Sequence, residues 1–187
     1  MPVTGPIFAL DLGQRAGFAV GAPGRAPRSG AVILKDKKEP RRVACGNLIA
    51  FLQAEWSTSC PSLVVTVSPM TLGAFFDMHS SEANVRLQYG LQAIVEGMCE
   101  RFGLPLEEIN EATVRKHFIG KGRMGDREST KLAVVSRCQV LGLMRRGSED
   151  NDRADAIAVH DWACATFGRR AISTSKLVFF GERAAAS

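Results

Sequence analysis

The sequence predicts an α/β fold on the strength of three observations. The chain opens with three short apolar runs separated by small-residue turns, a pattern typical of an antiparallel meander. A β-branched run at residues 63–67 then indicates a buried strand of the parallel type. Elsewhere the apolar residues recur at spacings of three and four, which indicates helices with one buried face.

The first two strands form a predicted hairpin that carries the first informative residue. Residues 7–13 contain an apolar run that ends in one carboxylate, Asp11, and residues 17–21 are the second apolar run. Aspartate is depleted in strands and costly to bury, so Asp11 needs either a hydrogen-bonding turn or a cation. Capping of the turn at Gly13 and binding of a cation are both open interpretations at this point.

The remaining elements follow from their own local patterns. The longest helix is the clearest, because its apolar stripe runs unbroken from Leu87 to Phe102. The patterns predict a third strand, a helix, the buried strand, the long helix, a short strand and three further helices: residues 29–34, 43–56, 63–67, 84–102, 104–110, 113–118, 130–141 and 152 onward.

Composition describes an ordinary globular protein with a moderate positive charge. The chain has 187 residues, of which 45% are hydrophobic and 23% charged, enough for one domain with a full core. No apolar run reaches the length of a membrane span, and residues 1–6 do not form a signal peptide, so we expect no membrane partner. A net charge of +5 suits a polyanionic partner.

The cysteines and histidines are scattered along the chain. The five cysteines include no CxxC pair, which favours free thiols in a reducing compartment such as the cytoplasm and argues against a zinc site or a disulfide framework. We also expect His79, His117 and His160 not to be metal ligands, because they are far apart in the sequence.

The loop at residues 68–81 is unusually apolar and includes Phe75 and Phe76. Loops often turn such side chains inward, and packing against the core is the interpretation we favour. The alternative is that Phe75 or Phe76 stacks on or wedges between DNA bases.

A second loop, residues 119–129, is rich in glycine and in basic side chains. Lys121, Arg123 and Arg127 lie in it, and this combination suits contact with phosphates, although a merely solvated loop is an equal alternative. Lys131 follows near the start of a predicted helix, where a cation is unfavourable against the helix dipole. A residue placed against local preference suggests a use such as phosphate binding.

The last predicted helix opens with two acids. Asp152 and Asp155 are three residues apart and therefore share a helix face. One aspartate is enough for N-capping, and Asp155 lies beyond the cap between small residues that allow close packing. A metal ion shared with Asp11 would explain a second acid held against the core.

In this order the elements resemble a known family. Residues 7–21 and 152–156 resemble the RuvC branch of the RNase H-like nucleases, the Holliday-junction resolvases, and the form they suggest is that of a phage or prophage. The resemblance continues through residues 87–91, residues 114–120 and Lys131, and covers about 7–166.

The resemblance implies an architecture and a reaction. It implies an RNase H-like fold with a central mixed five-stranded sheet, an antiparallel meander plus parallel strands, flanked by helices. The nuclease domain would span 1–166, with 167–187 as an extension or tail. The protein would act as a homodimer that cleaves branched DNA, such as a four-way junction, with Mg²⁺ or, in its place, Mn²⁺.

The resemblance also assigns roles to individual residues. It implies that the metal ligands are Asp11, Asp152 and Asp155. Lys131 matches a basic residue near the reacting phosphate. The adjacent Arg115 and Lys116 match a basic position that holds the DNA backbone.

One position departs from the family pattern. The family has a glutamate at the end of the central parallel strand, where this sequence has Val67, and valine cannot coordinate a cation. Three accounts are open: Asp77 or Glu82 swings in, three carboxylates suffice with weaker metal affinity, or the protein binds junctions without cutting them. The sequence therefore predicts a junction-resolving endonuclease, with a weakened or inactive branched-DNA-binding protein as the alternative.

Overall fold

The computed structural model describes residues 3–69 and 82–168. Its centre is a five-stranded mixed sheet in the order β3-β2-β1-β4-β5. The strands are β1 (Ile7–Asp11), β2 (Arg15–Gly21), β3 (Arg28–Ile33), β4 (Leu63–Val67) and β5 (Leu106–Ile109). The first three strands are antiparallel, whereas β4 runs parallel to both β1 and β5, as a mixed sheet requires.

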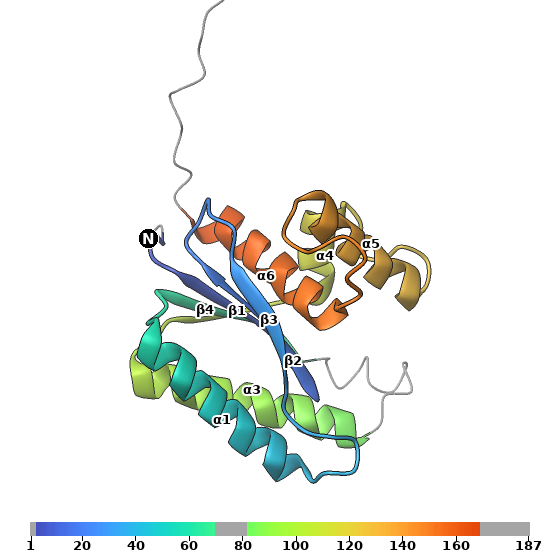
Figure 1. The fold of residues 1–187 in the computed structure, drawn as a ribbon. Helices are drawn as coiled ribbons and strands as arrows, with labels where there is room; N and C mark the ends of the chain where they lie inside the picture. The colour runs from blue at the N-terminus through green and yellow to red at the C-terminus, as the bar shows by residue number, and fades with distance from the viewer. Residues whose placement is uncertain (1–2, 70–81, 169–187) are drawn as a thin grey trace, which may run out of the picture.

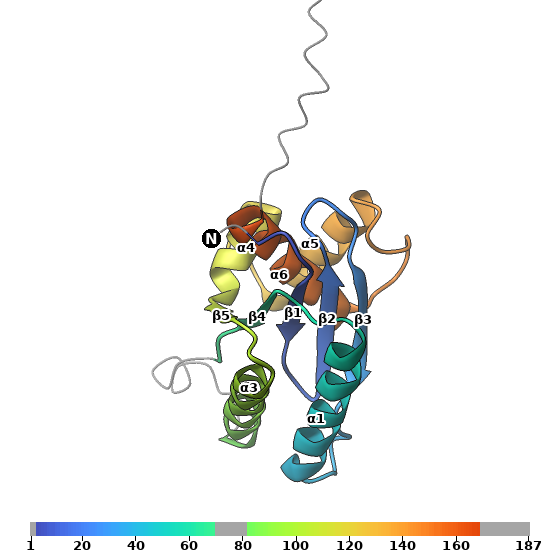
Figure 2. The same cartoon turned by 90° about the vertical axis from the view of Figure 1, so that its left-hand side faces the viewer.

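Helices cover both faces of this sheet (Figure 1). On one face lie α1 (Arg41–Thr58) and α3 (Glu82–Phe102), which pack against each other. The other face is covered by α6 (Asn151–Phe167), and α4 (Glu111–Ile119) and α5 (Arg127–Val140) pack on α6. Figure 2 shows the same layers after a quarter turn, with α4, α5 and α6 on the opposite side of the sheet from α1 and α3.

Alternation along β1 divides the core into two parts. Phe8 and Leu10 point to the α1/α3 face, where aromatic rings pack, and the rings of Phe8 and Trp56 meet edge to face at 6.0 Å. Ile7 and Ala9 point to the α6 face. Since side chains alternate along a strand, Asp11 also belongs to the α6 face.

The predicted strands and helices are all present, and the predicted fold is confirmed. All five described helices begin one to three residues earlier than the apolar pattern predicts, and a polar residue caps the start of both α4 and α5. The side chain of Asn110 accepts from the backbone N–H of Ala112 at 2.8 Å, and that of Asp126 accepts from Ser129 at 2.6 Å. Arg127 is therefore the first residue of α5 rather than a loop residue.

Some predictions concern parts of the chain outside the described residues. Phe75, Phe76, Asp77 and His79 lie there, and so does most of the predicted tail at 167–187. At the end of the described part, Gly168 forms a parallel bridge with Val3. All five cysteines are free thiols, and within 3–69 and 82–168 no helix is long and apolar enough to cross a membrane.

Candidate active site

The N-terminus of α6 lies directly on the β1–β2 hairpin, and Gly17 permits this contact. A Cβ on Gly17 would lie 1.9 Å from the backbone oxygen of Asp152 and 3.1 Å from the Cβ of Ala156. Gly17 is also the cross-strand partner of Asp11. Directly opposed residues of an antiparallel pair face the same side of the sheet, so Asp11 faces the first turn of α6.

Capping of α6 does not use the two predicted acids. The side chain of Asp150 is the cap, and it accepts from the backbone N–H of Arg153 at 3.2 Å. Asp152 and Asp155 are therefore free of the capping role that would have explained them without function. Both are half-buried, and Asp155 lies between Ala154 and Ala156, which are fully buried.

The acids are close enough to alter one another's ionisation. Burial is the main cause that raises the pKa of Asp11 well above its usual range. Three nearby carboxylates raise it further: those of Asp155, Glu111 and Asp152. Burial likewise raises the pKa of Asp155, to about 6. Within the described part of the chain, the side chains of Asp11 and Asp155 have no hydrogen bond and no ion pair.

Basic side chains from three elements, α4, α5 and β2, offset the negative charge of this cluster. Arg115 on α4 lowers the pKa of both Asp11 and Asp155, and Lys131 on α5 lowers that of Asp155. Arg15 at the start of β2 forms ion pairs with Asp150 at 2.6 Å and with Asp152 at 3.1 Å. Lys131 is therefore close enough to Asp155 to affect its ionisation, and its role at a reacting phosphate stays a prediction.

A small cavity opens next to Asp11 at the end of the parallel strands. Its volume is about 30 Å³, room for one water-sized group, and Val67 lines it together with Asp11. Gln92 from α3 also lines it. The Gln92 side chain is only 3% exposed, and its Oε1 has no hydrogen-bond partner.

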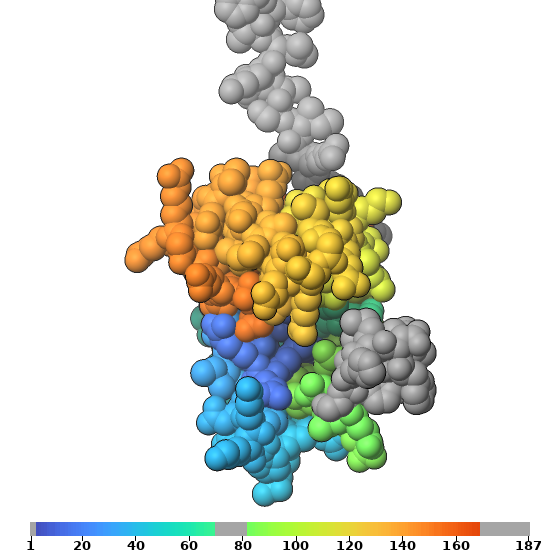
Figure 3. Space-filling view, turned by 90° about the vertical axis from the view of Figure 1, so that its right-hand side faces the viewer, coloured from blue at the N-terminus to red at the C-terminus, as the bar shows by residue number. Residues whose placement is uncertain are grey.

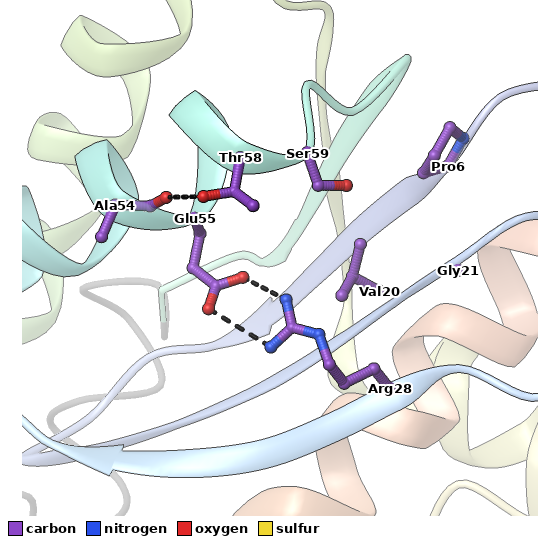
Figure 4. A pocket seen from close by; sticks show the side chains of 8 residues that line it. All are labelled: Pro6, Val20, Gly21, Arg28, Ala54, Glu55, Thr58 and Ser59. Carbon is purple, nitrogen blue, oxygen red and sulfur yellow. Dashed lines mark hydrogen bonds and ion pairs between the residues drawn. The ribbon is translucent and has the colours of Figure 1, made fainter.

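A second cavity, of about 530 Å³, lies between α1 and the first strands (Figure 4). Arg28 and Glu55 face each other across it and form an ion pair, and the hydroxyl of Thr58 donates to the carbonyl of Ala54 at 3.0 Å. The residues that line it include none of the predicted site residues.

The donor set of the acidic cluster fits a hard divalent cation. Carboxylate and amide oxygens are the ligands that Mg²⁺ and Mn²⁺ prefer, and no histidine or cysteine lines the small cavity. Within residues 3–69 and 82–168, no group of three or more His, Cys, Asp or Glu side chains is arranged so that it could hold one metal ion. Asp152 is turned to Arg15, so binding of an ion would require that ion pair to open.

The other predicted basic residues, which we call the basic rim, are exposed on α4, on the loop that follows it and at the start of α5: Lys116, Lys121, Arg123 and Arg127. The loop that carries part of it is fixed at its base, because the backbone N–H of Met124 donates to the buried Thr130 hydroxyl at 3.0 Å. In Figure 3 the yellow surface of α4 and α5 borders the blue surface of the first strands. Arg115 differs from the rim, because its side chain is only 17% exposed and faces the acids.

Sequence reasoning missed three residues of this region: Arg15, Gln92 and Glu111. Glu111 raises the pKa of both Asp11 and Asp155, although it was not considered as a partner of either. Its position directly after the short strand that precedes α4 was the available signal. Glu82, which was considered, forms an ion pair with Arg86 at 2.6 Å, and its side chain is 71% exposed.

Comparison with solved structures identifies the fold. The Thermus thermophilus RuvC structure matches with a TM-score of 0.60 at 17% identity, over 83% of this chain and 90% of that chain. T. thermophilus RuvC in complex with Holliday junction substrate matches with 0.60 at 16% identity, over the same shares of 83% and 90%. The yeast mitochondrial Holliday junction resolvase Ydc2 matches with 0.55 at 9% identity, over 88% and 80%.

Comparison of the sequence alone gives no match, either to a family model or to a curated protein. The structural matches confirm the predicted RuvC-like, RNase H-like fold, and the phage or prophage type stays a prediction. At identities below one fifth, likeness of structure establishes the fold, and function has to be argued from the site.

Proposed function

We propose that this protein is a metal-dependent endonuclease that resolves four-way DNA junctions. The observation that supports the proposal is the packing of the first turn of α6, which carries Asp152 and Asp155, on the β1–β2 hairpin beside Asp11. These acids come from opposite ends of the chain, and two of them have raised pKa values without a hydrogen-bonding partner. Such carboxylates, buried against like charge, favour a bound cation.

Asp11, Asp152 and Asp155 would hold Mg²⁺, or Mn²⁺ in its place. When bound, such ions lower the pKa of a water molecule and stabilise the leaving oxygen of a phosphodiester. Asp11 and Asp155 would lose their protons to become ligands, which the raised pKa values make costly without a cation. Lys131, beside Asp155, would neutralise the charge that develops on the phosphate.

The basic rim and Arg115 would hold the DNA backbone. These rim residues are exposed, and contacts of basic side chains with phosphates position a duplex without reading its sequence: Lys116, Lys121, Arg123 and Arg127. A homodimer would present two such sites to the two symmetric strands of a junction. A cytoplasmic location, where thiols stay reduced, is consistent with the five free cysteines.

A second candidate function is binding of branched DNA with weak or no cleavage. Val67 favours it, because this side chain lines the cavity beside Asp11 and contributes no oxygen ligand. Under this alternative the basic rim keeps its role, and the acids bind a cation too weakly for catalysis.

A gel assay on a synthetic four-way junction separates the two functions. The endonuclease proposal expects paired nicks with Mg²⁺ or Mn²⁺, none in EDTA, and none for Asp11→Asn, which should still bind the junction. Binding by the wild-type protein without nicking at any concentration of either metal would favour the alternative. An absence of preference for the junction over linear duplex would contradict both.

A further inference from the structure

We propose that Glu111 supplies a fourth carboxylate ligand to the metal site formed by Asp11, Asp152 and Asp155. The proposal rests on the proposed function, because it concerns the same site. It extends that function by naming a residue on α4 that would supply the carboxylate ligand that Val67 cannot provide.

The topology of the sheet brings Glu111 to the acids. The end of β4 pairs with the end of β5, where Val67 is the register partner of Ile109. The backbone N–H of Ser68 also donates to the carbonyl of Ile109 at 2.9 Å. Asn110 then caps α4, and Glu111 is the first residue of that helix. Glu111 therefore comes only two residues after Ile109, the partner of Val67, and Val67 lines the small cavity together with Asp11.

Glu111 has the charges of the acidic cluster around it. Its carboxylate raises the pKa of both Asp11 and Asp155, and for both acids it does so more than the carboxylate of Asp152 does. It forms an ion pair with Arg115, one helical turn later, and Arg115 in turn lowers the pKa of the same two acids. The Glu111 side chain is 55% exposed and that of Arg115 17%, so Glu111 lies on the solvent side of the acidic cluster.

An independent observation indicates that this place accepts a cation or its bound water. Gln92 lines the small cavity with Asp11 and Val67, and its buried Oε1 has no partner. The orientation of its amide is fixed, because Nε2 donates to the Thr66 hydroxyl at 3.1 Å and to Glu108 Oε1 at 2.7 Å. An unsatisfied buried oxygen is costly, and a hydrated divalent ion held by the neighbouring carboxylates would satisfy it.

The competing explanation is that Glu111 only stabilises α4. An acid in the first turn favours the helix dipole, and an ion pair four residues along the helix adds to it. This role would leave metal binding unchanged when the carboxylate is neutralised. The two explanations therefore differ in the affinity of the intact protein for a divalent ion.

The test is calorimetric titration of Mn²⁺ into the full-length, EDTA-treated protein, with Glu111→Gln compared with wild type. Glu100→Gln is the matched control, since Glu100 is exposed on α3, far along the chain from the acids. We expect Glu111→Gln to weaken Mn²⁺ binding at least ~10-fold, the scale of losing a group that supports a metal site, and Glu100→Gln to leave it unchanged. The double variant Glu111→Gln/Val67→Glu should recover affinity, because it moves the acid across to the neighbouring strand.

Each contrary outcome overturns either the role of Glu111 or the proposed function as a whole. Unchanged Mn²⁺ affinity in Glu111→Gln, together with loss of binding in Asp11→Asn, would overturn the role of Glu111 and leave the proposed function standing. A loss of affinity in Glu100→Gln as large as that in Glu111→Gln would mean that the carboxylate acts through overall charge and not as a ligand, and would also overturn the role of Glu111. Failure of the wild-type protein to bind Mn²⁺ at all would overturn both the inference and the proposed function.

Discussion

The two cavities of this protein differ in size and in the state of the charges that line them. The cavity between α1 and the first strands is the larger, about 530 Å³, and its ionic groups, Arg28 and Glu55, are paired with each other. The cavity at the end of β1 and β4 holds about 30 Å³, yet it is lined by Asp11 and Gln92. Among residues 3–69 and 82–168, neither the Asp11 carboxylate nor Gln92 Oε1 has a hydrogen-bond partner. Polar groups without partners, rather than volume, therefore mark the candidate site.

The sheet explains why the two regions differ. The small cavity lies at the carboxyl ends of two parallel strands, where side chains from separate elements meet and where α/β proteins commonly bind ligands. The larger one lies beside an antiparallel part of the sheet, where Val20 and Pro6 provide much of the wall. Substitutions that remove a charged group from one cavity and leave the other cavity unchanged test this difference.

The largest expected effect is that of Asp11→Asn on cleavage. Loss of a metal ligand removes several kcal/mol of charge stabilisation, which corresponds to at least ~10³-fold in rate. Rates of junction nicking in Mg²⁺ measure it. Glu55→Gln is the isosteric counterpart at the larger cavity, and it should nick at the wild-type rate. Equal losses in the two variants would remove the distinction between the regions.

The next effect is a dependence of stability on pH in the metal-free protein. The pKa of Asp155 is about 6 in the folded protein, against an ordinary value of 3.8. Between these two pH values the folded state retains a proton that the unfolded state loses. The stability that this proton contributes to the folded state is therefore fully present below pH 3.8, and it is lost as the pH rises through about 6. Asp11, whose pKa is also raised, acts in the same direction.

Urea unfolding in EDTA at several pH values measures this loss, which amounts to about 3 kcal/mol at most for Asp155. The difference between wild type and Asp155→Asn isolates it from other groups, and Mg²⁺ should restore the stability of wild type only. If the free energy of unfolding of the metal-free wild type changed with pH in the same way as that of Asp155→Asn, the acids would not be held against one another.

A third contrast concerns two glycines. Gly17→Ala would place a methyl group 1.9 Å from the backbone oxygen of Asp152, whereas Gly46→Ala on α1 meets nothing within 4 Å. We expect Gly17→Ala to destabilise the fold by about 1–3 kcal/mol as the helix is displaced. Gly46→Ala should stabilise it by about 0.5–1 kcal/mol, because alanine favours a helix interior. Urea midpoints measure both, and a neutral Gly17→Ala would mean that α6 does not lie so close to β2.

Much of the fold could be predicted from the sequence because its signals are local. The buried strands are apolar runs, and the long helix repeats its apolar residues at helical spacing. The starts of α4 and α5 were placed too late because the capping residues, Asn110 and Asp126, precede the apolar pattern.

The candidate site was only partly predictable, for a physical reason. Asp11 and Asp155 could be found because each contradicts its local surroundings, an acid in a buried strand and an acid between buried alanines. Glu111 contradicts nothing locally, since an acid in the first turn of a helix is favourable. Its relation to the acids depends on β5 lying next to β4, which no local pattern contains.

The smallest expected effect is that of Arg28→Gln at the larger cavity. This variant removes the ion pair with Glu55 and the contact of the guanidinium with the Phe18 ring, 5.3 Å from its centroid. The Arg28 side chain is 56% exposed, so we expect a cost of about 1 kcal/mol or less and no change in junction nicking. Urea unfolding and the nicking assay measure the two quantities on the same preparation. If Arg28→Gln instead abolished nicking while it bound Mn²⁺ as tightly as wild type, the larger cavity would take part in substrate positioning, since metal binding and DNA placement would then depend on opposite ends of the sheet.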